Sequence, residues 1–148
     1  SLMLDRLLSI FVETEDTSGP HLSVELAAAA LMLEVIWADH EINEDEIGEL
    51  QNHLTRIFAI DDHQFAGILS ETQTLHDESV GLHQFTTALN DFLDPNKKYE
   101  IVSALWRIAY ADEQLDILEE HIIRRISDLL YVSHKDFIRA KLEARDAL

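Results

Sequence analysis

Apolar residues recur along most of this chain at intervals of three and four, the spacing that places them on one face of an α-helix. From Leu22 to Trp37 the residues are almost continuously apolar, which is typical of a central helix buried on most sides. No stretch of strand length alternates apolar and polar residues. The pattern therefore predicts an all-α fold of about eight helices, at about 4–11, 22–37, 47–58, 61–69, 79–92, 94–110, 118–130 and 133–142.

Capping residues mark where four of these helices begin. Asp61, Ser79, Asp94 and Ser133 each precede a helical stripe, and their side chains can accept hydrogen bonds from amides of the first turn. Asp61 is followed three residues later by a glutamine, a capping-box pattern, and Asp94 is followed by a proline at the first helical position. We expect a helix to begin after each of the four.

The chain also repeats itself. Trp37 and Tyr110 each stand two residues before an aspartate, and six apolar positions between Leu50 and Phe65 match six others, in the same order, between Ile122 and Phe137. We interpret residues 3–148 as one domain of two pseudo-symmetric helix–turn–helix repeats forming one bundle. The first repeat spans about 22–70, a connector about 71–93, and the second repeat about 94–148.

Both repeats carry an acidic turn after their first helix, "ADHEINE" at 38–44 and "ADEQLDI" at 111–117. One interpretation is structural: Asn43 with Glu46, and Asp116 with Glu119, have capping-box spacing. Asp39 and Asp112 fit this interpretation less well, because each follows the C-terminus of a predicted helix, where the helix dipole disfavours an anion. Either carboxylate could still have a structural role by accepting hydrogen bonds from backbone amides of its own loop.

The alternative is a cation site. Asp39 with Glu46 and Asp112 with Glu119 could converge as hard oxygen ligands, a set that suits Ca²⁺ or Mg²⁺. Further ligands could come from Glu41, Asn43 and Asp116. An EF-hand is excluded, because counting from Asp39 the loop lacks glycine at its sixth position and glutamate at its twelfth. A di-iron bundle is not expected, because no histidine follows a glutamate by three residues.

Net charge narrows the class of partner. The formal charge of the 148 residues is −18, and residues 1–93 hold eighteen acidic residues against Arg6 and Arg56 alone. Nucleic acids and anionic membrane surfaces bind basic faces, so a basic protein or a cation is the expected partner. The sequence has no cysteine, Gly-rich phosphate loop, nucleophile elbow or metalloprotease motif, and no signal peptide or transmembrane stretch is visible. We expect a cytoplasmic protein that is not an enzyme.

With both turns in view, the chain resembles the TerB family of tellurite-resistance proteins, in an uncharacterised bacterial branch. The resemblance lies in "LAAAALMLEVIWADHEINEDEI", in "FTTALNDFL" and in "LWRIAYADEQLDILEEHIIRRISDLLYVSHKDFI". The family signature, Ala-Asp-Gly-x-Ile/Leu-x-x-x-Glu, falls on Ala38, Asp39, Ile42 and Glu46, and again on Ala111, Asp112, Leu115 and Glu119. His40 and Glu113 stand where the family has glycine, which puts the geometry of both turns in question.

The resemblance implies an all-helical fold of two similar halves, an acidic surface suggested to bind divalent cations, and a role in stress or metalloid-response complexes, some membrane-associated. Our first hypothesis is a non-enzymatic acidic interaction or sensing module that docks a protein partner and that a divalent cation modulates. The alternative is a dedicated divalent-cation-binding protein using the two acidic turns. A third hypothesis is a homodimer that pairs the N-terminal helices.

Overall fold

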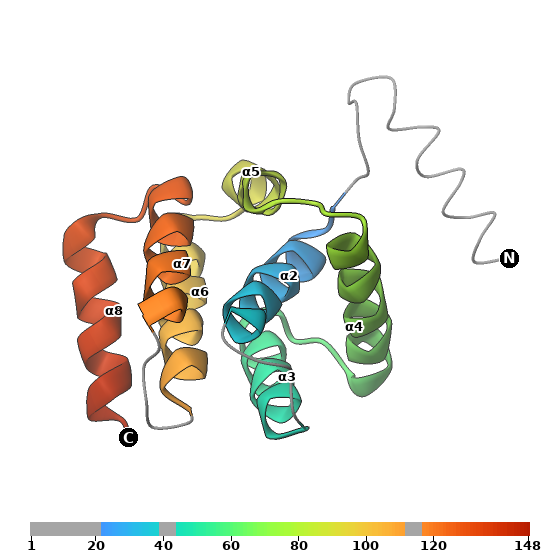
Figure 1. Cartoon of the computed structure of the whole chain (residues 1–148), viewed down its shortest axis with the longest axis horizontal. Helices are drawn as coiled ribbons and strands as arrows, with labels where there is room; N and C mark the ends of the chain where they lie inside the picture. The colour runs from blue at the N-terminus through green and yellow to red at the C-terminus, as the bar shows by residue number, and fades with distance from the viewer. Residues whose placement is uncertain (1–21, 39–43, 112–116) are drawn as a thin grey trace, which may run out of the picture.

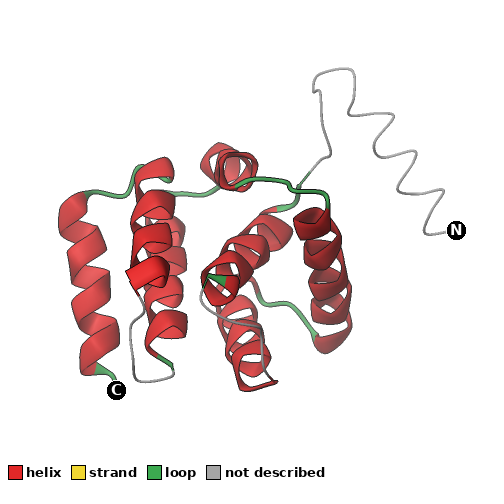
Figure 2. Cartoon of the chain, in the orientation of Figure 1, coloured by secondary structure: helices red, strands yellow, loops and turns green. Residues whose placement is uncertain are grey.

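The computed structural model describes residues 22–38, 44–111 and 117–148, and within these ranges the chain forms seven helices joined by short connections (Figures 1 and 2). The helices are α2 (Val24–Trp37), α3 (Glu44–Phe58), α4 (Asp62–Asp77), α5 (Leu82–Phe92), α6 (Pro95–Tyr110), α7 (Ile117–Leu129) and α8 (His134–Asp146). The predicted all-α class is confirmed. The predicted helix at about 4–11 lies outside the described residues. None of the described helices is long and apolar enough to cross a membrane.

Three of the four predicted helix starts are confirmed. Asp61 opens α4 with a complete capping box, in which its Oδ1 accepts from the Gln64 amide at 2.7 Å and Gln64 Oε1 accepts from the Asp61 amide at 2.9 Å. Asp94 Oδ1 accepts from the Lys97 amide at 2.8 Å, and Ser133 Oγ accepts from the Asp136 amide at 3.2 Å. These starts were predictable because each depends on chemistry within three residues.

The fourth predicted start is wrong. Ser79 does not cap α5; it ends α4 in the left-handed conformation, with φ of 61°, while the amide of Val80 donates to the Leu75 carbonyl at 3.0 Å. The N-cap of α5 is Gly81, which has no side chain to accept a hydrogen bond. Because α4 runs to Asp77, the boundary expected at about residue 70 lies inside this helix.

The helices are arranged around α2, which packs against α3, α4, α5, α6 and α7. The outer helices have narrower attachments, α4 mainly to α2 and α8 mainly to α6. In Figure 1, α4 and α8 therefore lie at opposite ends of the molecule, and α5 crosses its upper side. The two first helices of the predicted repeats, α2 and α6, pack against each other at the centre.

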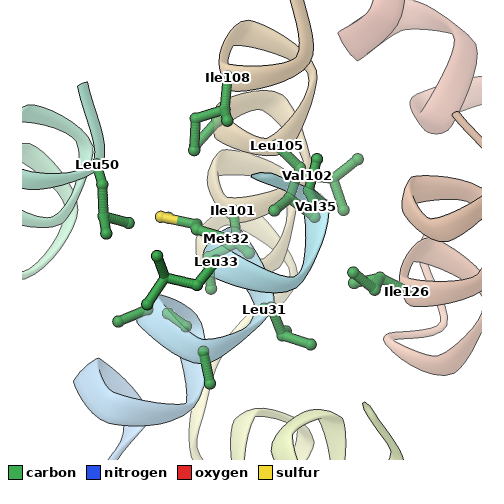
Figure 3. Close-up of a cluster of buried hydrophobic side chains, with 14 of the residues drawn as sticks. Leu31, Met32, Leu33, Val35, Leu50, Ile101, Val102, Leu105, Ile108 and Ile126 are labelled. Atoms are coloured by element: carbon green, nitrogen blue, oxygen red, sulfur yellow. The ribbon is translucent and has the colours of Figure 1, made fainter. Parts of the chain in front are cut away.

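One continuous core fills the space between these helices. Ten of the fourteen residues of α2 are buried, so this helix has no polar face, as its almost continuously apolar sequence predicts. Figure 3 shows side chains of α2 pointing in several directions, toward Leu50 of α3, toward Ile101, Val102 and Leu105 of α6, and toward Ile126 of α7. All of these side chains are fully excluded from solvent.

The first helix of each predicted repeat packs on the second helix of both repeats. α2 packs on α7 as well as on α3, and α6 packs on α3 as well as on α7. The carbonyls of Ile57 and of its counterpart Leu129 each accept a side-chain hydrogen bond, from Lys97 Nζ at 2.8 Å and from Asn90 Nδ2 at 2.9 Å, although the two donors are not counterparts of each other. A two-fold rotation between two repeats would give this packing of α2, α3, α6 and α7, which supports the predicted duplication; the duplication itself stays a prediction.

Candidate functional site

Most of the predicted cation ligands lie outside the described residues. These are Asp39, Glu41, Asn43, Asp112 and Asp116. His40 and Glu113, which stand at the family glycine positions and are not predicted ligands, also lie outside the described residues. Two ligands are described: Glu46 in the first turn of α3, and Glu119 in the first turn of α7. In the ranges that the structure describes, no three His, Asp or Glu side chains are placed to hold a metal ion. The ligand set stays a prediction.

The two described glutamates occupy the third position of their helices but have different surroundings. The Glu46 side chain is partly exposed, whereas Glu119 is only 3% exposed. A carboxylate buried this deeply has to accept hydrogen bonds or bind a cation, because its desolvation is otherwise too costly. The third helical position suits the return bond of a capping box, and it suits a ligand that faces the preceding turn equally well. Both sequence-based interpretations therefore survive for Glu119.

Charge is distributed unevenly over the described fold. Helices α2 to α5 with their connections, which we call the acidic half (residues 22–38 and 44–93), hold twelve carboxylates against a single Lys or Arg side chain, Arg56. Helices α6 to α8, in residues 94–111 and 117–148, hold eight carboxylates and nine Lys or Arg side chains. Because α4 and α8 lie at opposite ends, the negative charge is concentrated toward one end of the molecule (Figure 1).

Ion pairs follow the same division. Four pairs between Lys or Arg and a carboxylate lie within α6 to α8, including Lys141 with Glu120 at 3.1 Å. Arg56, in the acidic half, points instead to His53, with its Nη2 2.8 Å from the ring Nδ1. The negative charge of the acidic half is therefore largely uncompensated within the described residues, and it creates a field that attracts cationic groups.

His53 does not offset this charge. Burial, together with the nearby guanidinium groups of Arg56 and Arg107, lowers the pKa of His53 from 6.5 to about 4. The Glu49 carboxylate, 3.5 Å from Nε2, would favour the charged ring, but it is largely solvent-exposed and therefore screened. The imidazole is neutral at physiological pH.

A groove opens on the surface of the acidic half between the start of α2, the end of α3 and the first half of α4. Its volume is about 490 Å³. Apolar side chains line it together with polar side chains, two of which are carboxylates. Its lining includes Leu26, Phe58, Ile60, Ile68, Gly67, His63, Glu25 and Glu71. We call it the α2–α4 groove.

The carboxylates of Glu25 and Glu71 have no hydrogen-bond or ion-pair partner among the described residues. Both side chains are only partly exposed, so part of their hydration has already been lost. A cationic group entering the α2–α4 groove would meet unpaired carboxylates next to an apolar surface, and a hydrogen bond to either of them would be charge-assisted.

Sequence reasoning did not find this groove, because no motif marks it. A signal was present in the repeat itself. In the alignment of the two repeats, Gly67 corresponds to Arg139 and Ala59 corresponds to Tyr131, so small side chains of the first repeat stand where the second has large ones.

Comparison with known proteins places the chain in a family. The family model for tellurite resistance protein TerB matches residues 25–142, which is most of the chain and includes all of the described helices except the ends of α2 and α8. No curated protein and no solved structure matches the chain. Because the family model covers far more than half of the sequence, the chain belongs to the TerB family.

Proposed function

We propose that this protein is a non-enzymatic interaction and sensing module of a tellurite or metalloid stress response, and that it binds a basic protein partner through its acidic half. Membership of the TerB family supports a helical module related to tellurite resistance. The separation of charge in the fold is the observation that carries the docking proposal, because it leaves one end of the molecule strongly negative.

Electrostatic steering gives this arrangement a physical role. Complementary charge raises association rates and disfavours partners of the wrong sign, while short-range packing provides the affinity. A partner that binds here would be basic, as a free protein or as a subunit of a membrane-associated complex. Nucleic acid remains a poor candidate, because the phosphate backbone carries the same sign of charge as the acidic half.

Charge reversal in the two halves tests the proposal. Glu44 and Asp45 are exposed on the first turn of α3, and Asp128 and Asp146 are exposed on α7 and α8. We expect the Glu44→Lys/Asp45→Lys variant to lose partners that the wild type recovers from a native bacterial lysate. The Asp128→Lys/Asp146→Lys variant makes the same change in net charge and should keep them. Equal recovery by all three proteins would contradict docking through the acidic half.

A second candidate function is binding of a divalent cation, Ca²⁺ or Mg²⁺, by Asp39, Glu46, Asp112 and Glu119. The burial of Glu119 in the first turn of α7 supports it. Calorimetry with Ca²⁺, Mg²⁺, Mn²⁺ and Zn²⁺ on the wild type and on an Asp39→Asn/Asp112→Asn variant provides the test. Binding heat for one cation that disappears in the variant is the expected result, and heat that is absent or unchanged rejects the site.

A further inference from the structure

We infer that the α2–α4 groove is a docking site for a peptide segment that presents an arginine beside a tyrosine ring. This inference rests on the proposed docking function and gives it a place and a ligand chemistry. At the matching place in the second half of the molecule, the chain provides such side chains itself.

The correspondence between the two places is fixed by observed helix ends. Asp61 and Ser133 are the N-caps of the matching helices α4 and α8. Two positions before each cap stands a left-handed residue, Ala59 with φ of 56° and Tyr131 with φ of 60°. The helices α2 and α6 end at Trp37 and Tyr110, and counting back equally far from these ends pairs Leu26 with Tyr99.

In the second half, the place that matches the groove is occupied by side chains of α6 and α8. The Tyr99 hydroxyl donates to Glu143 Oε2 at 3.0 Å. The guanidinium carbon of Arg139 lies 4.2 Å from the centroid of the Tyr99 ring, within the range of a cation–π contact. Burial, together with Glu143, raises the pKa of Tyr99, so its hydroxyl keeps the proton that it donates.

The groove keeps the acceptor of this arrangement but lacks its two other members. Glu71 corresponds to Glu143, while Leu26 replaces the tyrosine and Gly67 replaces the arginine. An added Cβ at Gly67 would meet nothing within 4 Å, so the space is open. A ring and a guanidinium from another molecule can restore the contacts, because the carboxylate that they need is already present.

Charge and shape select this ligand over others. Glu25 and Glu71 give the groove negative charge that attracts a cation, and its apolar side chains Leu26, Phe58 and Ile68 suit the flat face of a ring. Arginine fits better than lysine, since its planar group can stack on an aromatic ring and bind a carboxylate with two hydrogens. Residues 1–21 of this chain hold four acids against Arg6, so they do not supply the complementary charge.

A titration followed by amide NMR tests the inference, with the terminally blocked peptide Ala-Arg-Tyr-Arg-Ala as the probe. We expect shifts concentrated at Leu26, Ala59, Gly67, Ile68 and Glu71, and weaker shifts with Ala-Lys-Ala-Lys-Ala, which has the same charge. Gly67→Arg places a guanidinium of the protein itself in the groove and should weaken binding of the peptide at least tenfold. Glu71→Gln removes the acceptor charge without adding bulk and should also weaken binding.

Gly48→Arg is the matched control. Gly48 is also a helical glycine of the acidic half with open space beyond its Cβ, but it does not line the groove. This variant should bind within about twofold of the wild type. Equal weakening by Gly48→Arg and Gly67→Arg would show diffuse attraction to the acidic half and reject the groove. Absence of binding at millimolar peptide, or equal binding of the lysine peptide, also rejects it.

Measurements on the protein without peptide can show that the groove has another occupant, and either of two results would overturn the inference. If Gly67→Arg lowers the mass measured by light scattering, a second copy occupies the groove. If Gly67→Arg shifts amide signals of residues 1–21 without peptide, the chain's own N-terminal segment covers it. The proposed docking function is tested separately. If the peptide does not bind the groove but the Glu44→Lys/Asp45→Lys variant loses its partners, the docking function is still supported. If that variant recovers the same partners as the wild type, the docking function is rejected.

Discussion

Three non-glycine residues in the described part of the chain adopt the left-handed conformation, and each of them follows the end of a helix. These are Ala59 after α3, Ser79 after α4 and Tyr131 after α7. A Cβ in this conformation crowds the following backbone, which costs on the order of 1 kcal/mol. The cost is accepted because the bend lets a loop amide return to the helix, as the Ala59 amide does to the Thr55 carbonyl at 2.8 Å.

Ala59→Gly should therefore stabilise the protein, by about 0.5–1 kcal/mol. Ala66, which is exposed within α4, is the matched control, and Ala66→Gly should destabilise by about 0.5–1 kcal/mol because glycine loses more entropy in a helix. Chemical denaturation of both variants measures the two effects. The same sign for both substitutions would contradict the strain assigned to Ala59.

His53 makes stability depend on pH. Its pKa is about 4 in the folded protein and 6.5 in the unfolded chain, so the unfolded chain takes up a proton first as pH falls. The stabilisation is fully present above pH 6.5 and is lost as pH falls toward 4. Between pH 7.5 and pH 5 the free energy of unfolding should fall by roughly 2 kcal/mol more in the wild type than in His53→Gln.

An NMR titration of the imidazole in the wild type tests the same statement without a substitution. We expect the His53 ring to stay neutral at pH 5.5, where exposed histidines are mostly protonated. A midpoint near pH 6.5 would show that Glu49 outweighs burial and the two arginines.

At the scale of single elements, local chemistry was easier to predict than helix length or packing. The starts at Asp61, Asp94 and Ser133 were predictable because a cap bonds amides only two or three residues away. Ser79 failed because a serine can open one helix or close another, and the choice depends on how far α4 extends. α4 reaches Asp77 because Thr72 and Leu75 are buried, a tertiary effect.

The candidate site was predictable only in part, for the same reason. Acidic residues and their uneven distribution are visible in the sequence, and the fold then places them toward one end of the molecule. The α2–α4 groove arises where Gly67 of α4 and Ala59 after α3 have small side chains beside the start of α2, and no single stretch of sequence shows that these places meet. The burial of Glu119 likewise depends on the packing around α7.

The helices should differ in how often they open. α2 and α6 have packed neighbours on most sides, whereas α4 and α8 are each held mainly by one helix. Local opening costs least where few packed contacts are lost. Native-state hydrogen exchange should therefore show the slowest amides in α2 and α6 and faster exchange along α4 and α8. Protection of α4 equal to that of α2 would contradict this order.

At the scale of the whole molecule, the charge is divided unevenly between the two ends, whereas the hydrophobic core is continuous. One end is strongly acidic and the other nearly balanced, yet both ends share a core that runs without a break from α2 through α6. The acidic end can bind a basic partner through the field of its carboxylates, while the balanced end keeps the short-range ion pairs of α7 and α8.

The burial of α2 on most sides determines how the protein can be divided. A fragment that stops before α6 would leave Leu31, Val35 and their neighbours exposed to water, and such a surface would aggregate instead of folding. The two similar parts are therefore not interchangeable modules that could be shortened, shuffled or fused singly. A protein made of only one of these parts would need a second copy to cover the side chains that the other part normally buries.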